Sequence, residues 1–338
     1  MIRMAVLVTG ASGFLGGALT QELVQRGETV RILARETSNL KHLENLDIVI
    51  VYGTLETKSR LETALDGVQV VYHCAGASKD WATWEEFYNA NVLGVQNLCE
   101  IAAASGTIQR FVHISTSDVY GYPKRACDET HPIRDIGLPY NRSKYLGEKI
   151  VWQFDQNTGL PVTIIRPVTI YGPRSKDFVV EIARLLLDSK MVLIAKGATP
   201  AGLLFIANAV DGIIAAASSP HTVGRAYNLR DETIETWRDY VWALADGLGV
   251  PRTRTNLPYS AAIALAYLFE GGFKLFRIKK RPLLTRHAVF FSSFDQSYAI
   301  ERARRDFGFR SKIDFQTGID QTIAWLKSAE GQSLILEN

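Results

Sequence analysis

The chain has 338 residues, with 38 Lys and Arg against 35 Asp and Glu, which gives a formal net charge of +3. Its 47% hydrophobic and 22% charged residues are typical of a globular protein and exclude an intrinsically disordered or collagen-like chain. The small net charge also indicates that the protein does not bind nucleic acid, because nucleic-acid-binding surfaces are strongly basic.

Short β-branched runs alternate with longer amphipathic segments along the first half of the chain. The predicted strands are 5–9, 29–34, 48–52, 68–74, 110–115 and 162–166. The helices predicted between them are 14–26, 58–66, 85–104 and 141–157. Strands that alternate with helices favour right-handed βαβ units and a parallel sheet covered on both faces. The prediction is therefore an α/β fold, a doubly wound parallel sheet of the Rossmann type.

A glycine-rich turn, Thr-Gly-Ala-Ser-Gly-Phe-Leu-Gly at 9–16, joins the first strand to the first helix. Gly10 permits a tight turn, Gly13 lets backbone N–H groups approach a pyrophosphate, and Gly16 allows close packing of the helix on the strand. The helix N-terminus adds a partial positive charge that favours phosphate. In this strand–turn–helix context the motif indicates a dinucleotide site rather than an empty turn.

The end of the second predicted strand indicates which dinucleotide binds. NAD sites place an acidic residue there, about 20 residues beyond the glycines, to bind the ribose 2′-hydroxyl. The run 30–35 contains no acid and ends at Arg35, whose guanidinium could pair with a 2′-phosphate. NADP(H) is therefore predicted in preference to NAD(H), with a solvated surface arginine as the alternative interpretation.

The strand predicted at 110–115 ends in hydroxyl residues, within Phe-Val-His-Ile-Ser-Thr-Ser-Asp-Val-Tyr-Gly at 111–121. The carboxyl edge of an α/β sheet is where ligands bind, so these hydroxyl groups are candidate ligand contacts. A polar strand end that shapes the following turn is the alternative. His113 is predicted to be a packed strand residue.

A tyrosine followed four residues later by a lysine places a phenol and an ammonium on one helix face. The ammonium favours the phenolate and lowers the pKa of a phenol, ordinarily about 10, which suits a general acid or base. Three pairs have this spacing: Tyr120/Lys124, Tyr140/Lys144 and Tyr145/Lys149. Gly121 and Pro123 oppose a helix in the first pair, but spacing does not choose between the other two.

The pattern of elements loosens in the second half of the chain. Helices are predicted at about 174–189, 208–218, 235–247 and 258–270, with short strands at 192–195 and 225–229. We expect a smaller, helix-rich part that packs over the carboxyl edge of the sheet. The predicted division is a dinucleotide-binding domain at 1–167 and a substrate-binding part at 168–338, with an interleaved boundary.

The segment 258–286 pairs an apolar stretch with basic residues, and it has no acid between 271 and 286. The basic residues are Lys274, Arg277, Lys279, Lys280, Arg281 and Arg286. This pattern suits a lid over an apolar substrate or a peripheral contact with anionic lipids. A core helix followed by a solvated basic loop is the alternative.

Location is predicted from the cysteines and the apolar runs. Cys74, Cys99 and Cys127 lack metal-ligand spacing, which predicts reduced intracellular thiols and no metal site. Residues 1–8 are too short for a signal peptide, and the longest apolar run, nine residues at 261–269, is too short to span a membrane. We expect a cytoplasmic protein, with a possible peripheral membrane contact.

Together the motifs resemble the extended short-chain dehydrogenase/reductase superfamily over almost the whole chain. The segments that carry the resemblance are 9–16, 73–76, 91–94, 115–121, 140–144 and 166–173. The family pattern Pro-Tyr-x-x-Ser-Lys selects Tyr140 and Lys144 and aligns Thr116 with the catalytic Ser or Thr. The resemblance implies that Tyr140 exchanges a proton with the substrate oxygen and that Thr116 hydrogen-bonds the reacting carbonyl or hydroxyl. It implies that Lys144 holds the nicotinamide ribose and lowers the pKa of the phenol.

The resemblance also implies a wider cofactor site and a homodimer formed through helices that include the Tyr140 helix. The implied cofactor contacts are Gly10, Ser12, Gly13, Phe14, Leu15, Gly16, Arg35, Thr54, Leu55, Ala75, Gly76, Ala77, Tyr140, Lys144, Pro167 and Val168. The family usually has Asp at position 54, so Thr54 departs from its pattern.

Two branches of the superfamily resemble different parts of the chain. The segment 115–121 is similar to sugar-nucleotide epimerases and dehydratases, but dehydratases carry an Asp-Glu pair where this chain has Ser117-Asp118. The segments 281–286 and 298–309 are similar to the 3β-hydroxysteroid dehydrogenase branch, which includes sterol-4-carboxylate 3-dehydrogenases and 2-alkyl-3-oxoalkanoate reductases.

The second similarity implies an oxidoreductase that interconverts a secondary alcohol and a ketone by hydride transfer, and the Arg35 prediction makes it NADP(H)-dependent. Its substrate would be a small apolar molecule, sterol-like or a 2-alkyl-3-oxoacyl compound. A sugar-nucleotide epimerase or dehydratase and a non-catalytic NADP-sensing protein are the alternatives. A sensor has no need of a phenol–ammonium pair, which argues against it.

Overall fold

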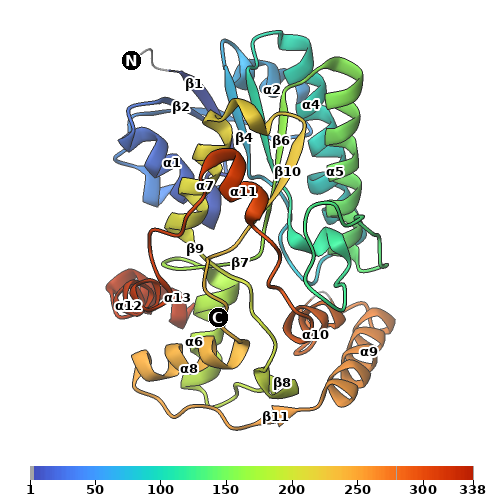
Figure 1. Ribbon diagram of the computed structural model, residues 1–338, viewed down its shortest axis with the longest axis vertical. Coiled ribbons are helices and arrows are strands. Elements are labelled where there is room, and N and C mark those ends of the chain that lie inside the picture. The colour runs from blue at the N-terminus through green and yellow to red at the C-terminus, as the bar shows by residue number, and fades with distance from the viewer. Residues whose placement is uncertain (1–3, 279, 338) are drawn as a thin grey trace.

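A sheet of seven parallel strands lies between two layers of helices in the computed structural model, which describes residues 4–278 and 280–337 (Figure 1). The strand order is β10-β6-β5-β4-β1-β2-β3. The strands are β1 (Ala5–Thr9), β2 (Thr29–Ala34), β3 (Ile48–Tyr52), β4 (Val70–His73), β5 (Arg110–Ile114), β6 (Val162–Pro167) and β10 (Arg225–Leu229). The predicted Rossmann-type α/β fold is confirmed, and the order reverses between β1 and β4, where such sheets bind ligands.

Each face of the sheet has its own hydrophobic core. Alternate residues of a strand point to opposite faces, so Val6 and Val8 join one cluster while Leu7 joins the other. The first face is covered by α1 (Phe14–Gln25) and α7 (Ile206–Ser218). The second face is covered by α2 (Lys58–Leu65), α4 (Gly94–Ser105) and α5 (Pro139–Thr158).

The helix predicted at 85–104 is divided into three parts in the structure. These parts are α3 (Trp84–Tyr88), the π-helical turn η2 (Asn89–Leu93) and α4. A π-helical turn adds a residue to the helical path and re-aims the side chains within it. Asn91 lies in this turn and forms hydrogen bonds with Ala77 and Ser143. The helical periodicity of the sequence does not reveal the π-helical turn.

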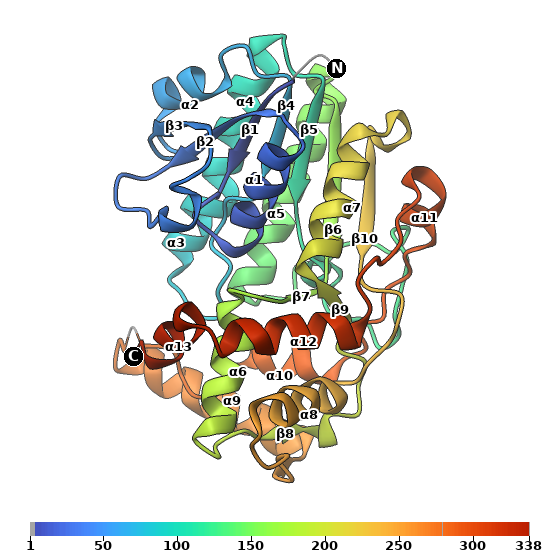
Figure 2. The same cartoon turned by 90° about the vertical axis from the view of Figure 1, so that its left-hand side faces the viewer.

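Residues beyond β6 form a second layer at the carboxyl end of the sheet, as Figure 2 shows. Two short parallel strand pairs lie there, β7 (Thr169–Tyr171) with β9 (Leu203–Phe205) and β8 (Leu193–Ile194) with β11 (Asn256–Leu257). The helical elements there are η4 (Lys176–Val180), α6 (Glu181–Leu187), α8 (Trp237–Leu248), α9 (Tyr259–Leu275), α10 (Arg286–Ser293), α12 (Phe315–Leu326) and α13 (Ala329–Leu336), whereas α11 (Glu301–Phe307) packs beside β10 and α7. The last four helices, together with β7, β9 and β11, were not predicted from the sequence.

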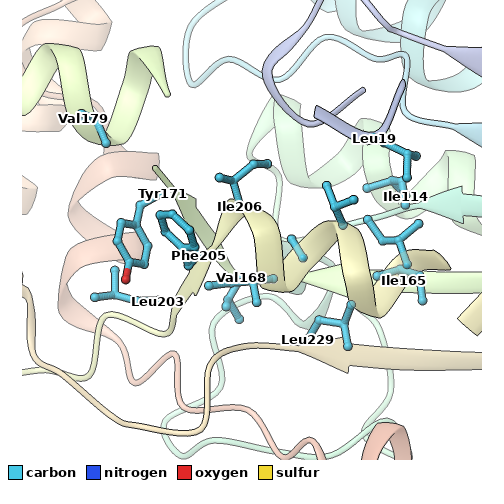
Figure 3. Packing of buried hydrophobic residues seen from close by; sticks show 14 of the residues in the cluster. Leu19, Ile114, Ile165, Val168, Tyr171, Val179, Leu203, Phe205, Ile206 and Leu229 are labelled. Atoms are coloured by element: carbon cyan, nitrogen blue, oxygen red, sulfur yellow. The ribbon is translucent and has the colours of Figure 1, made fainter. Parts of the chain in front are cut away.

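One hydrophobic cluster extends from the sheet into this second layer. Figure 3 follows it from Leu19 and Ile114 beside the sheet, across Ile206, to Tyr171 and Phe205. Residues of 168–338 also contribute β10 and α7 to the sheet and its cover. The division at 167 stays a prediction.

Within the described residues, no helix is both long and apolar enough to cross a membrane. Two predictions fall partly outside the described residues. They concern the N-terminal segment 1–8, of which residues 1–3 are not described, and the basic segment, of which Lys279 is not described.

Candidate active site

The glycine-rich turn between β1 and α1 brings backbone segments into close contact. Gly10 has a φ of +76°, and a Cβ built on it would lie 2.7 Å from the backbone nitrogen of Ala75. A Cβ on Gly16 would collide with the carbonyl oxygen of Gly10, which accepts the N–H of Gly13 at 2.9 Å. Positions 10 and 16 therefore accept glycine alone, and the turn lies directly against the loop that follows β4.

The first turn of α1 presents backbone N–H groups beside this glycine turn. Gly13 is the N-cap residue, and no side chain in the described part of the chain caps this helix end. Ser12, Phe14 and Leu15 surround it and are partly exposed. Uncapped N–H groups and the helix dipole favour an anion, so the turn can hold the pyrophosphate of a dinucleotide.

The ends of β2 and β3 form the corner where the sequence places Arg35. The two ends are joined by the N–H of Gly53, which donates to the carbonyl oxygen of Ala34 at 2.9 Å. Arg35 follows β2 and its side chain is exposed. A Cβ on Gly53 would lie 2.6 Å from the Cβ of Arg60, so a second exposed arginine starts from the same corner. Sequence reasoning identified only the first of these two guanidinium groups.

Thr54 and Leu55 follow β3 and have different roles in the structure. The Thr54 hydroxyl lies 3.1 Å from Thr57 Oγ1 and accepts the N–H of Glu56 at 3.3 Å, so it shapes its own turn. The carbonyl oxygen of Leu55 accepts Nδ2 of Asn97 in α4 at 3.0 Å. Leu55 is therefore held in place by α4 and offers a fixed apolar surface at this corner.

Asn91 connects the loop after β4 to the helix that carries Tyr140. Its buried amide accepts the N–H of Ala77 at 2.8 Å and donates to the carbonyl oxygen of Ala77 at 3.0 Å and to Ser143 Oγ at 2.9 Å. Ser143 in turn donates to the carbonyl oxygen of Tyr140 at 2.8 Å. A Cβ on Gly76 would lie 2.8 Å from Asn91 Oδ1. The predicted cofactor loop at 75–77 is thus fixed relative to α5.

The helix α5 begins with Pro139 at its first position, so Tyr140 lies in the first turn and Lys144 one turn later. Lys144 is buried, and its Nζ donates to the carbonyl oxygen of Ile114, the last residue of β5, at 2.7 Å. Burial lowers the pKa of Lys144 to about 8. The structure therefore directs this lysine toward the carboxyl edge of the sheet.

The other two Tyr/Lys pairs lie elsewhere. Lys149 is exposed, and its Nζ rests 5.3 Å from the centroid of the Tyr145 ring on the outer side of α5. Tyr120 is buried and donates to Asn228 Oδ1 at 2.7 Å, whereas Lys124 is exposed. Burial thus separates pairs that spacing could not separate.

The Tyr140 phenol lies among hydroxyl groups at the end of β5. Burial raises the pKa of Tyr140 above its ordinary range, Asp118 adds to the rise, and hydrogen bonding with Ser78 and Thr116 opposes it. The phenol is therefore protonated at neutral pH and can donate a proton to an oxygen placed beside it. That Lys144 lowers this pKa stays a prediction.

Asp118 is a polar centre of the site that sequence reasoning did not select. Its carboxylate accepts Thr116 Oγ1 at 3.1 Å and the Tyr122 hydroxyl, and it lies 3.5 Å from Nε2 of His287. Burial opposes ionisation, yet His287 and these hydroxyls hold the pKa of Asp118 below its ordinary value. Against the effect of burial, Asp118 raises the pKa of His287. A carboxylate thus lies next to an imidazole with a raised pKa beside Tyr140, whose ring meets the His287 ring edge-on, with 5.5 Å between centroids.

An aromatic wall continues from His287 into the second layer, formed by Phe291 of α10, Phe178 of η4 and Trp237 of α8. Phe291 stacks on His287 with ring centroids 5.9 Å apart, and Phe178 stacks on Phe291 at 5.5 Å. Trp237 meets Phe291 at 5.7 Å. The wall places apolar surface on the side of Tyr140 that the second layer covers.

A buried polar network supports the strand ends beneath the site. Arg166 forms an ion pair with Glu148 and donates to the Tyr120 hydroxyl at 2.8 Å. Ser115 Oγ donates to Glu148 Oε2 at 2.6 Å, which ties β5 to α5. Such a satisfied network fixes the register of β5, β6 and α5. Pro167 and Val168 follow Arg166 directly and are buried beside it.

The structure therefore brings Thr116, Tyr140 and Lys144 to one place and puts the glycine turn and the 75–77 loop beside it. Asp118 and His287 join them. The position of Asp118 two residues after Thr116 could have indicated that it belongs to the site. No sequence pattern connects His287 to Asp118 or to Thr116. The arrangement provides a proton donor, a hydroxyl that can hydrogen-bond the same oxygen, and an anion-binding helix end.

Comparisons with known proteins identify relatives along the whole chain. Residues 6–229 match the family described as the NAD dependent epimerase/dehydratase family. The 4-hydroxy-2-methyl-3-oxo-4-farnesyl-3,4-dihydroquinoline-1-oxide ketoreductase of Stigmatella aurantiaca is 30% identical over 320 residues, which cover 94% of this chain and 95% of that protein. The 2-alkyl-3-oxoalkanoate reductase of Stenotrophomonas maltophilia is 28% identical, covering 94% of this chain and 97% of that protein.

Solved structures share the fold. The dTDP-glucose 4,6-dehydratase DesIV of Streptomyces venezuelae, solved with NAD bound, is similar with a TM-score of 0.80 at 23% identity. The match covers 97% of this chain and 98% of that one. This likeness extends to both the sheet and the second layer.

Proposed function

Because the chain belongs to the NAD dependent epimerase/dehydratase family of extended short-chain dehydrogenases/reductases, as its motifs predict, we propose that this enzyme is an NADP(H)-dependent oxidoreductase that interconverts a secondary alcohol and a ketone. The proposed substrate is a small apolar molecule, such as a sterol-like or 2-alkyl-3-oxoacyl compound. The observation that carries the proposal is the aromatic wall beside the Tyr140 phenol. The names of two relatives, a ketoreductase for a farnesyl quinoline compound and a 2-alkyl-3-oxoalkanoate reductase, support it.

Tyr140, Thr116 and Lys144 each have a part in the proposed reaction. When bound, the nicotinamide supplies the hydride for reduction or accepts it for oxidation. Tyr140 donates its proton to the substrate oxygen during reduction and recovers one during oxidation. Thr116 Oγ1 has a single proton, which Asp118 accepts at 3.1 Å, so Thr116 donates to the same oxygen only after it turns this proton away from Asp118. Lys144, fixed by its bond to Ile114, holds the nicotinamide ribose and supplies positive charge near the phenol.

The proposed preference for NADP(H) rests on Arg35, which follows β2, and on Arg60 of α2, whose Cβ lies beside Gly53 at the end of β3. The phosphate that distinguishes NADP from NAD carries a negative charge, and a guanidinium binds phosphate with paired N–H donors. Arg35 and Arg60 are both exposed there, and no acid occupies the end of β2. Arg60 adds a second cation to the one expected from the sequence.

The test is a turnover screen of the purified protein. Apolar 3-oxo compounds are offered with NADPH or NADH, the corresponding alcohols with NADP+ or NAD+, and sugar nucleotides with each cofactor. We expect the absorbance of reduced nicotinamide to change in step with an apolar product. A converted sugar nucleotide without net change in this absorbance would indicate the epimerase or dehydratase alternative. Tight cofactor binding without turnover of any compound would indicate an NADP-sensing protein.

We also propose that the protein forms a homodimer through helices that include α5 and works in the cytoplasm. The free thiols of Cys74, Cys99 and Cys127 support a reducing compartment. Light scattering on the purified protein tests the first proposal, and fluorescence of a tagged full chain in its own cells tests the second.

A further inference from the structure

The helix α9 leaves several of its large apolar side chains exposed, while two of its alanines are buried. Ala262 and Ala266 are fully buried on its inner side. Tyr267, Leu268 and Leu275 are 57%, 69% and 77% exposed on its outer side. A surface helix ordinarily buries its large apolar residues, so this arrangement leaves out of the core the side chains that gain most from burial.

The outer side carries a row of exposed residues. Ala264, Leu268, Gly271 and Leu275 are spaced three or four residues apart and are all exposed, which places them on one face of the helix. Phe276, Ile278 and Leu283 continue the surface beyond the helix end and are also exposed. We call Tyr267, Leu268, Leu275, Phe276, Ile278 and Leu283 together the α9 surface. An apolar patch of this kind marks an interaction site.

Figure 1 shows α9 along an outer edge of the molecule, with α10 on its inner side. The two helices are packed against each other through a small hydrophobic cluster that contains Ala262, Ala266 and Val289. The α9 surface therefore lies behind the helix that supplies His287 and Phe291 to the candidate active site.

Exposed positive charge borders the α9 surface. Lys274, Arg277 and Lys280 are exposed. The only acid of α9, Glu270, is buried and is already bound by Arg286 at 2.8 Å, with Lys274 Nζ at 3.9 Å. Arg281 is engaged by Asp80, to which its Nε donates at 2.6 Å. Among the described basic residues of this segment, Arg281 and Arg286 are thus held inward, Lys274 is exposed although Glu270 lies 3.9 Å away, and Arg277 and Lys280 are exposed.

We propose that the α9 surface binds to the surface of a membrane that contains anionic lipids. The apolar side chains would enter the boundary between headgroups and acyl chains, and Lys274, Arg277 and Lys280 would contact the headgroups. Apolar residues bordered by lysine and arginine are the composition that such a contact requires. A second copy of the chain fits less well, because a symmetric contact through this surface would bring the same three positive charges together.

The proposal is tested by sedimentation of the full-length protein with vesicles of phosphatidylcholine, alone or mixed with phosphatidylglycerol. We expect binding to the mixed vesicles, little binding to phosphatidylcholine alone, and weaker binding as salt screens the headgroups. Leu275→Glu/Phe276→Glu should weaken binding about tenfold or more. Each of Lys274→Gln, Arg277→Gln and Lys280→Gln should weaken it about fivefold.

Leu336→Glu is the matched control, because Leu336 is also 77% exposed but lies in α13, away from the α9 surface. It should bind the mixed vesicles like the unaltered protein. Because the substituted side chains are exposed, each variant should fold, and thermal unfolding and cofactor binding check that it does. Absence of binding to mixed vesicles, or equal binding by the Leu275→Glu/Phe276→Glu protein, would overturn the proposal. The proposal would also be overturned if the unaltered protein did not bind vesicles and the Leu275→Glu/Phe276→Glu protein lost a dimer. The α9 surface would then join two copies of the chain.

Discussion

Nε2 of His287 lies 3.5 Å from Oδ1 of Asp118, and the two side chains are 17% and 4% exposed. The contact joins α10, in the second layer, to the turn that follows β5 and carries Thr116. Asp118 raises the pKa of His287 while His287 lowers that of Asp118. Since histidine and aspartate ordinarily titrate near 6.5 and 3.8, both groups are charged throughout the interval between these values.

Replacing His287 by phenylalanine should lower the free energy of unfolding by about 1–3 kcal/mol, because the buried carboxylate of Asp118 loses its cation. The phenylalanine keeps the ring that stacks on Phe291, so packing changes little. The stabilisation due to the raised pKa of His287 is complete below about pH 6.5 and disappears as pH rises through the folded-state pKa. The part due to Asp118 is complete above about pH 4 and disappears as pH falls. Denaturant unfolding across this range measures the difference.

The control for this prediction is Asp118→Asn, alone and combined with His287→Phe. The amide keeps a hydrogen-bonding oxygen for Thr116 and Tyr122 but has no charge that needs a cation. The two substitutions should therefore cost less together than the sum of their separate effects. Additive losses of unfolding free energy would show that the pair makes no energetic contribution.

Tyr140→Phe should lower turnover about 10²–10⁴-fold, because the variant has no proton to donate to the substrate oxygen. Cofactor binding should stay near that of the unaltered enzyme, since the ring remains in its packing beside Phe87. Steady-state kinetics and fluorescence titration with NADPH measure the two effects. Tyr145→Phe, on the same helix but outside the site, is the matched control and should keep full turnover. Full turnover by the Tyr140→Phe enzyme would remove the phenol from the mechanism.

Lys144→Met tests the cost of a buried ammonium. The pKa of Lys144 is lowered to about 8 from 10.5, so between these values the unfolded chain binds more protons than the folded one. The unaltered protein should therefore gain stability relative to Lys144→Met as pH rises from 8 to 10.5. Lys149→Met, at an exposed position of the same helix, should show no such pH dependence. A constant stability difference across this range would mean that Lys144 keeps an ordinary pKa when folded.

The sheet was predictable because its signals are local. The runs at 5–9, 29–34 and 48–52 are short and rich in β-branched residues, and the structure has strands with these bounds. The last of them, β3, is an edge strand, so Val49, Ile50 and Tyr52 stay exposed. Gly10 and Gly16 were likewise readable, since a turn that brings a strand end, a helix start and a second loop together excludes any Cβ.

The substrate side of the site was less predictable because its contacts join distant segments. His287 lies in an eight-residue helix that the periodicity of the sequence does not predict. Its partner Asp118 comes from the other half of the chain. The choice of Tyr140/Lys144 over Tyr145/Lys149 depended on family resemblance, since both pairs have the same spacing. Burial distinguishes them only once α5 packs against the sheet. Arg60 was not predicted as a cofactor contact because it comes near the end of β2 only in the folded protein. The pairing of β2 with β3 brings Gly53 beside Ala34, and Arg60 lies beside Gly53.

Arg35→Ser should weaken NADPH binding about tenfold to a hundredfold while leaving NADH binding nearly unchanged, because only NADP carries the 2′-phosphate that the guanidinium would pair with. Arg60→Ser should have a smaller effect in the same direction, since Arg60 extends from α2 beside Gly53, one strand further from the end of β2. Fluorescence titration with both cofactors measures the ratio of their Kd values. Arg31 provides the matched control, because its guanidinium is already bound to the carbonyl oxygens of Ala64 and Asp66 at 2.9 and 2.8 Å. Arg31→Ser should change both Kd values equally, whereas an unchanged ratio in both Arg35→Ser and Arg60→Ser would contradict the proposed preference for NADP(H).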